Sequence, residues 1–186
     1  VLNFEQTNVY SSVPFHDGFD TDNSLYYKSS KIAFMSVNYV TTTLRDVADF
    51  LVQDLNSGEE IHILSVHLKA SIDQETARFN ETTIIRNYLN NYPANTNIII
   101  VGDFNFYRST ETGFQKLIGS ETNNNGQVKD PLIAIGIWNG NVALTSIHTQ
   151  SPRIRAFGGG STGGLDDRFD LILTSYALDD NILVST

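Results

Sequence analysis

An apolar run that ends in a glycine and two polar residues places the strongest constraint on how this chain can fold. Residues 98–101 (Ile-Ile-Ile-Val) form the longest such run, and Gly102-Asp103-Phe104-Asn105 follows it directly. Four β-branched residues in succession are typical of a strand that is buried on both faces. We therefore expect a central strand that delivers Asp103 and Asn105 to one edge of a sheet.

The remaining pattern predicts several strands with helices inserted between them. Strands are expected at 25–28, 32–40, 61–68 and 169–173, where β-branched and aromatic residues gather. Helical spacing at 47–55 is also possible, but Asn56-Ser57-Gly58 leads into a clear strand, so a hairpin is the better interpretation. Helices are expected at 74–92, before Pro93, and at 110–118. This order predicts an α+β fold of two packed sheets flanked by helices, a four-layer α/β/β/α sandwich.

Length and charge narrow the possible classes of protein. The chain has 186 residues, which fits a single domain spanning 1–186, and its apolar runs are too short to cross a bilayer. Its formal net charge of −9 argues against a protein that holds nucleic acid by broad electrostatic attraction, although it does not exclude a nuclease. The absence of cysteine excludes disulfides and thiolate chemistry.

Asp103 and Asn105 form the first candidate site. In an extended strand, residues two apart point to the same side. A carboxylate can bind a metal or accept a proton from water, and an amide can orient water or a phosphate oxygen. A plain turn is the alternative, because Asp and Asn both favour turns.

Two further strands carry a polar residue among apolar neighbours. His67 follows Ile61, Ile63 and Ser65 on one face of its strand and could donate a hydrogen bond to a phosphate oxygen. A core histidine is the alternative. Asp170 lies inside an apolar strand, where an unpaired carboxylate is costly. It could hold a catalytic histidine, or it could pair with an arginine such as Arg168 or Arg78.

The order of these motifs resembles the endonuclease/exonuclease/phosphatase superfamily, and secreted bacterial members in particular. The resemblance covers nearly the whole chain. The matching strings are Leu25-Tyr26-Tyr27-Lys28, Val66-His67-Leu68-Lys69-Ala70, Arg78, Gly102-Asp103-Phe104-Asn105 and Arg168-Phe169-Asp170-Leu171-Ile172-Leu173, with echoes at Asp20-Thr21-Asp22-Asn23, at His148-Thr149-Gln150-Ser151-Pro152-Arg153 and in the glycine-rich stretch before Asp166.

The resemblance implies a deoxyribonuclease-like fold and a divalent metal, Mg²⁺ or Mn²⁺, with Asp103 as a ligand. It implies that an activated water attacks phosphorus in line. Asp103 would activate that water, Asn105 would orient it, and His67 would stabilise charge on the phosphoryl oxygens. Asp170 would orient a second histidine. Lys69, Arg78 and Arg168 are expected to bind substrate.

The chain also departs from the family pattern. The family's first-strand Asn and metal-binding Glu have no clear counterpart, since Glu5 is a poor candidate, and no Ser-Asp-His string follows Asp170. We therefore expect a domain that lacks its N-terminal and C-terminal parts, and a 186-residue piece with little or no activity by itself.

The leading interpretation is a metal-dependent phosphodiester hydrolase, with nucleic acid as the default substrate. The alternatives are a lipid or small-molecule phosphohydrolase and a non-catalytic binding module. We expect no membrane span and no obligate protein partner. Resemblance to secreted bacterial members suggests export.

Overall fold

The computed structural model describes residues 9–18, 20–150, 153 and 164–178. These residues form two sheets, two α-helices and two short 3-10 helices. The strands are β1 (Tyr10–Ser12), β2 (Tyr26–Lys28), β3 (Ile32–Val40), β4 (Val47–Asp54), β5 (Glu60–His67), β6 (Ile98–Asp103), β7 (Val128–Lys129) and β8 (Asp170–Ser175). The helices are η1 (Ile72–Gln74), α1 (Glu75–Leu89), α2 (Thr112–Ile118) and η2 (Val142–Ile147).

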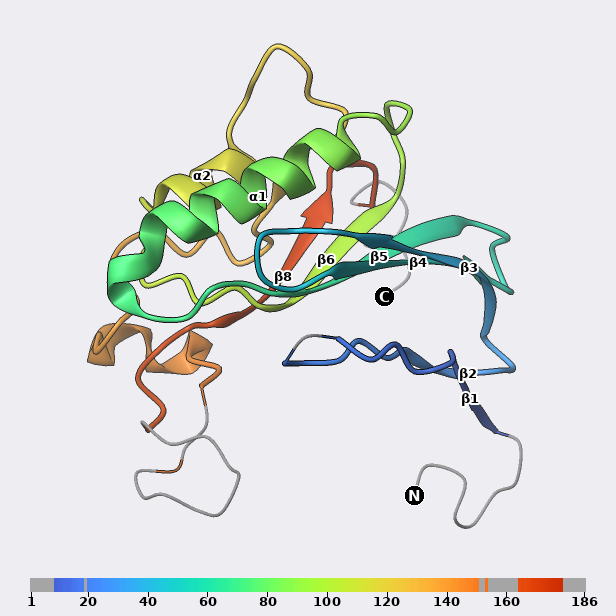
Figure 1. Cartoon of the computed structure of the whole chain (residues 1–186), viewed down its shortest axis with the longest axis horizontal. Helices are drawn as coiled ribbons and strands as arrows, with labels where there is room; N and C mark the ends of the chain where they lie inside the picture. The colour runs from blue at the N-terminus through green and yellow to red at the C-terminus, as the bar shows by residue number, and fades with distance from the viewer. Residues whose placement is uncertain (1–8, 19, 151–152, 154–163, 179–186) are drawn as a thin grey trace.

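Six of the strands form one sheet, in the order β3-β4-β5-β6-β8-β7. Only β5 and β6 pair in parallel, and α1 lies in the connection between them, as a parallel crossover requires. Helices α1 and α2 cover one face of this sheet, and the β1–β2 hairpin lies on the other face, beneath β3 and β4 (Figure 1).

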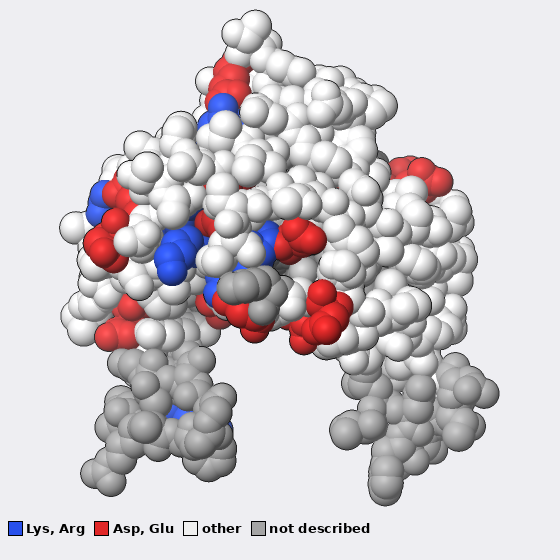
Figure 2. All heavy atoms as spheres, viewed as in Figure 1, with Lys and Arg blue, Asp and Glu red and all other residues white. Residues whose placement is uncertain are grey.

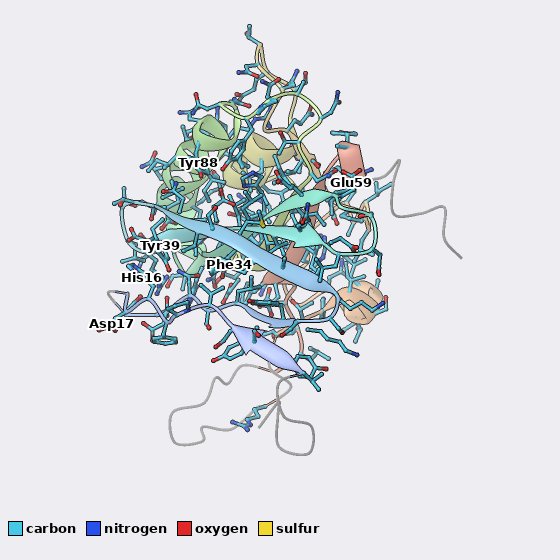
Figure 3. All side chains as sticks on the ribbon, turned by 90° about the vertical axis from the view of Figure 1, so that its right-hand side faces the viewer. His16, Asp17, Phe34, Tyr39, Glu59 and Tyr88 are labelled. Atoms are coloured by element: carbon cyan, nitrogen blue, oxygen red, sulfur yellow. The ribbon has the colours of Figure 1, made fainter. Side chains whose placement is uncertain are left out.

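The two faces of the sheet have separate apolar cores. The larger core lies under the helices and includes Leu64, Ile85, Ile100 and Leu173. The smaller one joins the hairpin to β3 and β4 around Phe50. An aromatic stack strengthens the second contact: the His16 ring lies on the Tyr39 ring with centroids 3.8 Å apart (Figure 3). Because side chains alternate between the two faces of a sheet, every second residue of β5, β6 and β8 faces away from the helices.

The structure confirms the predicted α+β class. The strand expected at 32–40 has those bounds, the ambiguous stretch at 47–55 is the first strand of a hairpin, and the helix expected at 74–92 is shorter at both ends. Within the described part of the chain, no helix is long and apolar enough to cross a membrane. The glycine-rich stretch at 158–163 lies outside the described residues, and the expected extent of the domain stays a prediction.

Gly102 lets β5 and β6 approach each other where both strands end. Its φ is +141°, a backbone conformation that other residues rarely adopt. A Cβ atom at this position would lie 2.0 Å from the Val66 carbonyl oxygen, which belongs to the neighbouring strand. Any side chain here would therefore push apart the two strands that carry His67 and Asp103.

We predict that Gly102→Ala lowers the free energy of unfolding by about 3 kcal/mol or more, because the new methyl group clashes with backbone that cannot move freely. Gly58→Ala is the matched control. Gly58 also has positive φ, at +78°, but nothing lies within 4 Å of the place that a Cβ atom would occupy there. The control should cost only about 1–2 kcal/mol. Urea unfolding of both variants measures the difference, and equal losses would contradict the steric argument.

Candidate active site

His67, Asp103 and Asp170 form a row across three neighbouring strands. His67 is the register partner of Asp103 in the β5–β6 pair, and Asp103 is the register partner of Asp170 in the β6–β8 pair. The neighbouring positions Val66 and Leu171 belong to the core under the helices, so the row faces the opposite side of the sheet. His67 Nε2 lies 3.7 Å from Asp103 Oδ2. The structure thus brings together three of the four residues predicted to be catalytic.

The fourth, Asn105, lies beneath the row. It is buried and adopts a left-handed backbone conformation with φ of 53°. Its backbone N–H donates to Asp103 Oδ1 at 3.0 Å, and its Nδ2 donates to the Leu68 carbonyl at 3.1 Å. These contacts are those of a turn that holds the end of β6, and a role of Asn105 toward a substrate stays a prediction. Asn105 fixes the Asp103 carboxylate and the end of β5, and its amide nitrogen is directed into the protein instead of toward a substrate.

The electrostatics of the row raise the pKa of both of its carboxyls. Burial raises the pKa of Asp103, against the opposing effect of His67 and the Asn105 N–H. Burial and the negative charge of Asp103 raise the pKa of Asp170. Burial and the nearby Arg45 guanidinium lower the pKa of His67. At neutral pH His67 is therefore a neutral imidazole that can donate one hydrogen bond and accept another.

Arg45 supports the row, and sequence reasoning missed it. Its Nη1 donates to the carbonyls of His67 and Leu68, both at 3.3 Å. Its Nε and Nη2 bind both oxygens of Asp20, at 2.6 and 2.7 Å. Arg45 lies in the turn between β3 and β4, and nothing in that turn indicates a distant partner. Asp20 lies in one of the strings that the family resemblance singled out. That string was the one signal in the sequence from which the Arg45 contact could have been expected.

Two of the three residues expected to bind substrate are buried inside the protein. Arg78 is 0% exposed, and its Nε donates to Glu111 at 2.9 Å while Nη1 donates to the carbonyls of Lys69 and Ser71. Arg168 is 2% exposed and binds both oxygens of Asp130, at 2.7 and 2.8 Å.

These contacts correct the interpretation of both arginines, because neither guanidinium has a surface from which to touch a substrate. They also exclude the ion pair that was considered between Asp170 and one of the two. Lys69 is different: it is half-buried directly after β5, with its backbone N–H held by Glu81 at 2.9 Å. Of the three basic residues, Lys69 alone is not fully buried.

The second histidine that Asp170 was expected to hold is not among the described residues. His62 binds Asp49 on the helix side of the sheet, at 3.0 Å, as its alternation from His67 suggested. His16 stacks on Tyr39. Both ring nitrogens of His148 face backbone carbonyls, those of Leu165 and Trp138. Glu5, the poor candidate for a metal ligand, lies outside the described residues.

The row fits a divalent cation only in part. Carboxylate oxygens are the ligands that Mg²⁺ prefers, and Asp103 and Asp170 provide two carboxylates side by side. Bound positive charge would offset the repulsion that raises the pKa of Asp170. However, the described residues contain no group of three His, Asp or Glu side chains that could hold a metal ion. The predicted magnesium ligand Asp103 therefore stays a prediction.

Comparison with solved structures confirms the expected fold. The chain is similar to the human Nocturnin catalytic domain with bound sulfate (16% identity, TM-score 0.62, covering 95% of this chain and 67% of that one). It is similar to D. rerio TDP2 complexed with a single-strand DNA product (14%, 0.57, 93% and 64%). It also resembles an endonuclease/exonuclease/phosphatase family protein from Bacteroides thetaiotaomicron (15%, 0.56, 90% and 60%).

The chain spans about two thirds of the length of these structures or somewhat less. No protein-family model and no curated relative matches the sequence, so the likeness is one of fold. The deoxyribonuclease-like fold that the resemblance implied is thus the fold of the described residues, and the activity has to be argued from the site.

We predict that Asp103→Asn raises the free energy of unfolding at pH 7, by about 1 kcal/mol or less because Asp103 is partly exposed. Folding raises the pKa of Asp103, so the ionised form is less stable in the folded chain than in the unfolded chain. The gain should disappear as the pH falls below 3.8, the ordinary carboxyl value, where both states are protonated.

Asp130→Asn is the matched control, for which we expect the free energy of unfolding to change in the opposite direction. Burial opposes ionisation of Asp130, but hydrogen bonds from Arg168 outweigh it and lower its pKa. This variant should lose about 2 kcal/mol or more at pH 7, since it leaves Arg168 without its charged partner. Urea unfolding at pH 7 and pH 3.5 measures both. A loss of stability in Asp103→Asn at pH 7 would contradict the argument.

We further predict that Arg78→Ala lowers the free energy of unfolding by about 3–5 kcal/mol, because it leaves the buried Glu111 carboxylate unpaired. Lys116→Ala removes a more exposed pair, with Glu121, and should cost about 1 kcal/mol or less. Thermal and urea unfolding compare the two. A change below about 1 kcal/mol in Arg78→Ala would contradict the structural role of the Arg78–Glu111 pair.

Proposed function

We propose that this chain supplies the central residues of a divalent-metal-dependent phosphodiester hydrolase, and that nucleic acid is its substrate. The observation that carries the proposal is the row of His67, Asp103 and Asp170 on one face of the sheet, at the ends of three paired strands. The fold it shares with Nocturnin and TDP2 supports the reaction class, and the DNA product bound by TDP2 supports the substrate.

Asp103 has the properties of a group that positions a water molecule and accepts its proton. Its carboxylate is about one third exposed, so water can reach it. Its pKa is raised by burial, and a base is most effective when its pKa approaches the working pH. The Asn105 N–H holds Oδ1, which leaves Oδ2 for water or for a cation. Asn105 is thus a positioning residue.

His67 is suited to donate a hydrogen bond to a phosphoryl oxygen. Its ring is about one third exposed, and its lowered pKa makes it neutral at pH 7. As negative charge grows on the phosphoryl oxygens, a donor that is already in place stabilises the transition state more than the ground state. Arg45 contributes by holding the backbone carbonyl of His67.

The charge distribution limits how nucleic acid could bind. The face shown in Figure 2 carries small, intermixed groups of cationic and anionic residues and no extended basic patch. With a net charge of −9, broad attraction to a phosphate backbone is weak. We therefore propose that a nucleic acid substrate is held by a few contacts near the row, with Lys69 among them.

A lipid or small-molecule phosphohydrolase is the second candidate. Five exposed aliphatic side chains between Leu132 and Val142 favour it, because they offer an apolar surface. A non-catalytic binding module remains the alternative from another class. Export, which the resemblance suggested, stays a prediction.

Hydrolysis assays on the complete natural chain test the proposal. With Mg²⁺ or Mn²⁺ present, we expect cleavage of plasmid DNA and of bis(p-nitrophenyl) phosphate that a chelator abolishes. Asp103→Ala should lower kcat by about a thousandfold or more, because residues that act as a unit lose most of the rate together. Glu121→Ala removes an exposed carboxylate that pairs with Lys116 and has no contact with the row among the described interactions, so it serves as the control.

The outcomes separate the candidates. Chelator-sensitive cleavage that survives Asp103→Ala would exclude Asp103 as the key carboxylate. Cleavage of the small diester but not of DNA would favour the second candidate. Absence of all hydrolysis by the folded natural chain would leave the non-catalytic binding module as the remaining candidate function.

A further inference from the structure

Residues 148–150, which we call the strap, lie across the segment that leads into β8. The backbone N–H groups of Thr149 and Gln150 both donate to the Asp167 carbonyl, at 2.9 and 3.2 Å. The Thr149 hydroxyl accepts the Asp170 N–H at 2.9 Å and donates to the Asp170 carbonyl at 3.2 Å. The strap therefore holds the backbone at the point where Asp170 enters the row.

His148 begins the strap, and both of its ring nitrogens face backbone carbonyls. Nδ1 lies 3.2 Å from the Leu165 carbonyl oxygen, and Nε2 lies 3.1 Å from that of Trp138. A carbonyl oxygen only accepts hydrogen bonds, so each contact needs a hydrogen on the ring nitrogen. A neutral imidazole carries one such hydrogen and an imidazolium carries two. Both hydrogen bonds can therefore exist together only when His148 is positively charged.

The two carbonyls belong to different parts of the fold. Trp138 is fully buried, its ring packs edge-on against Phe114, and its N–H donates to the Tyr107 carbonyl at 2.9 Å. The Trp138 carbonyl is thus fixed to the core under the helices. Leu165 is exposed and lies in the segment before β8. His148 therefore connects this segment to a rigid part of the protein.

The position of the ring is explained by contacts within the described part of the chain. Each nitrogen already has an acceptor there, so no partner from outside needs to be invoked. The string from His148 to Arg153 is one of those that the family resemblance singled out, and the proposed hydrolysis assigns it no role. A contact between His148 and the segment that carries Asp170 gives this string a role.

Asp167 provides negative charge near the ring. It is 4% exposed, and its Oδ1 has no hydrogen-bond partner among the described residues. Burial raises the pKa of Asp167, the Asn139 hydrogen bond lowers it, the neighbouring Asp166 raises it further, and His148 opposes these increases. An anion in this position stabilises the charged form of the ring relative to the neutral form.

Few other charged groups lie on the elements packed against the ring. Residues 138–141 and η2 carry no charged side chain. In the segment before β8, Arg168 is bound to Asp130. Beyond the strap, the Arg153 carbonyl accepts the Gly164 N–H at 2.9 Å. Among these side-chain types, only histidine ordinarily changes its charge between about pH 5 and 8.

Loss of the ring proton breaks one half of the His148 contact. The neutral ring keeps a single donor, so one of the two carbonyls then faces a nitrogen lone pair instead of an N–H. One hydrogen bond is lost, and its acceptor is left unpaired. The contact is therefore complete at low pH and weakens as the pH rises through the range of about 5 to 8 in which histidine titrates.

We propose that His148 is a pH-sensitive link that holds Asp170 in the row. The charged ring binds the strap to both carbonyls, whereas the neutral ring releases one of them and lets residues 164–170 open more often. The consequence for catalysis rests on the proposed function, because it needs Asp170 to take part in hydrolysis. The link itself does not depend on turnover, so the two proposals can fail separately.

Hydrogen exchange of the complete natural chain tests the proposal. The amide hydrogens of Thr149, Gln150 and Asp170 are followed, with correction for the intrinsic exchange rate at each pH. Their protection should fall about fivefold between about pH 5 and 8, the effect expected from one lost hydrogen bond. In His148→Gln this change with pH should disappear, because glutamine offers a neutral amide donor that does not titrate.

His16→Gln is the matched control. His16 stacks on Tyr39 and has no contact with the strap among the described interactions, so this variant should keep the pH dependence of the unmodified chain. Protection that does not change with pH in the unmodified chain would overturn the proposal. So would a pH dependence that survives in His148→Gln, or one that is lost equally in His16→Gln.

A measurement on the unmodified natural chain keeps the proposal testable even where His148→Gln does not fold. At about pH 5, both ring N–H hydrogens of His148 should give NMR signals, because hydrogens bonded to carbonyls exchange slowly with water. A ring that shows one signal or none at that pH does not hold both carbonyls, and this result would contradict the proposed link.

Discussion

The close approach of two parallel strands at Gly102 is the constraint on which the rest of the structure depends. Because Gly102 has no side chain, the β6 backbone can lie against the Val66 carbonyl, and this contact sets the register that makes His67 and Asp103 neighbours. The α1 crossover, the Arg45 contacts to the His67 and Leu68 carbonyls, and the Asn105 contact to the Leu68 carbonyl all converge on the same place. Contacts to the backbone thus fix the position of the strands, and the strands in turn fix the positions of the side chains of the row.

Local pattern predicted much of the fold. The β-branched and aromatic residues of β3 and the run of β-branched residues in β6 are visible in sequence, because strand propensity and burial leave a direct signature. The row was also predictable in part, since His67, Asp103 and Asp170 are each a polar residue at one end of an apolar strand. What sequence could not supply was the partner of each charge. Arg78 pairs with Glu111 and Arg168 with Asp130 across long separations, and only the folded chain selects these partners.

Orientation was the second limit of sequence reasoning. Asp103 and Asn105 were expected to point the same way, as they would in a strand, but the strand ends at Asp103 and Asn105 turns inward with positive φ. The exposure of Ile133 and Ile135 was equally hidden, because an apolar segment after a strand is normally interpreted as core. In both cases the chain departs from regular structure, where local sequence pattern no longer predicts the direction of a side chain.

The origin of the row in three distant parts of the sequence has a consequence for how the chain folds. Pairing of β5 with β6 requires closure of the α1 crossover, and pairing of β8 with β6 requires closure of the whole segment from α2 to η2. Contacts of this kind carry a large loop-closure entropy and form late and slowly. A partly folded chain would have helices and a β3–β4–β5 meander but no paired carboxyls, so the appearance of the row reports completion of the sheet.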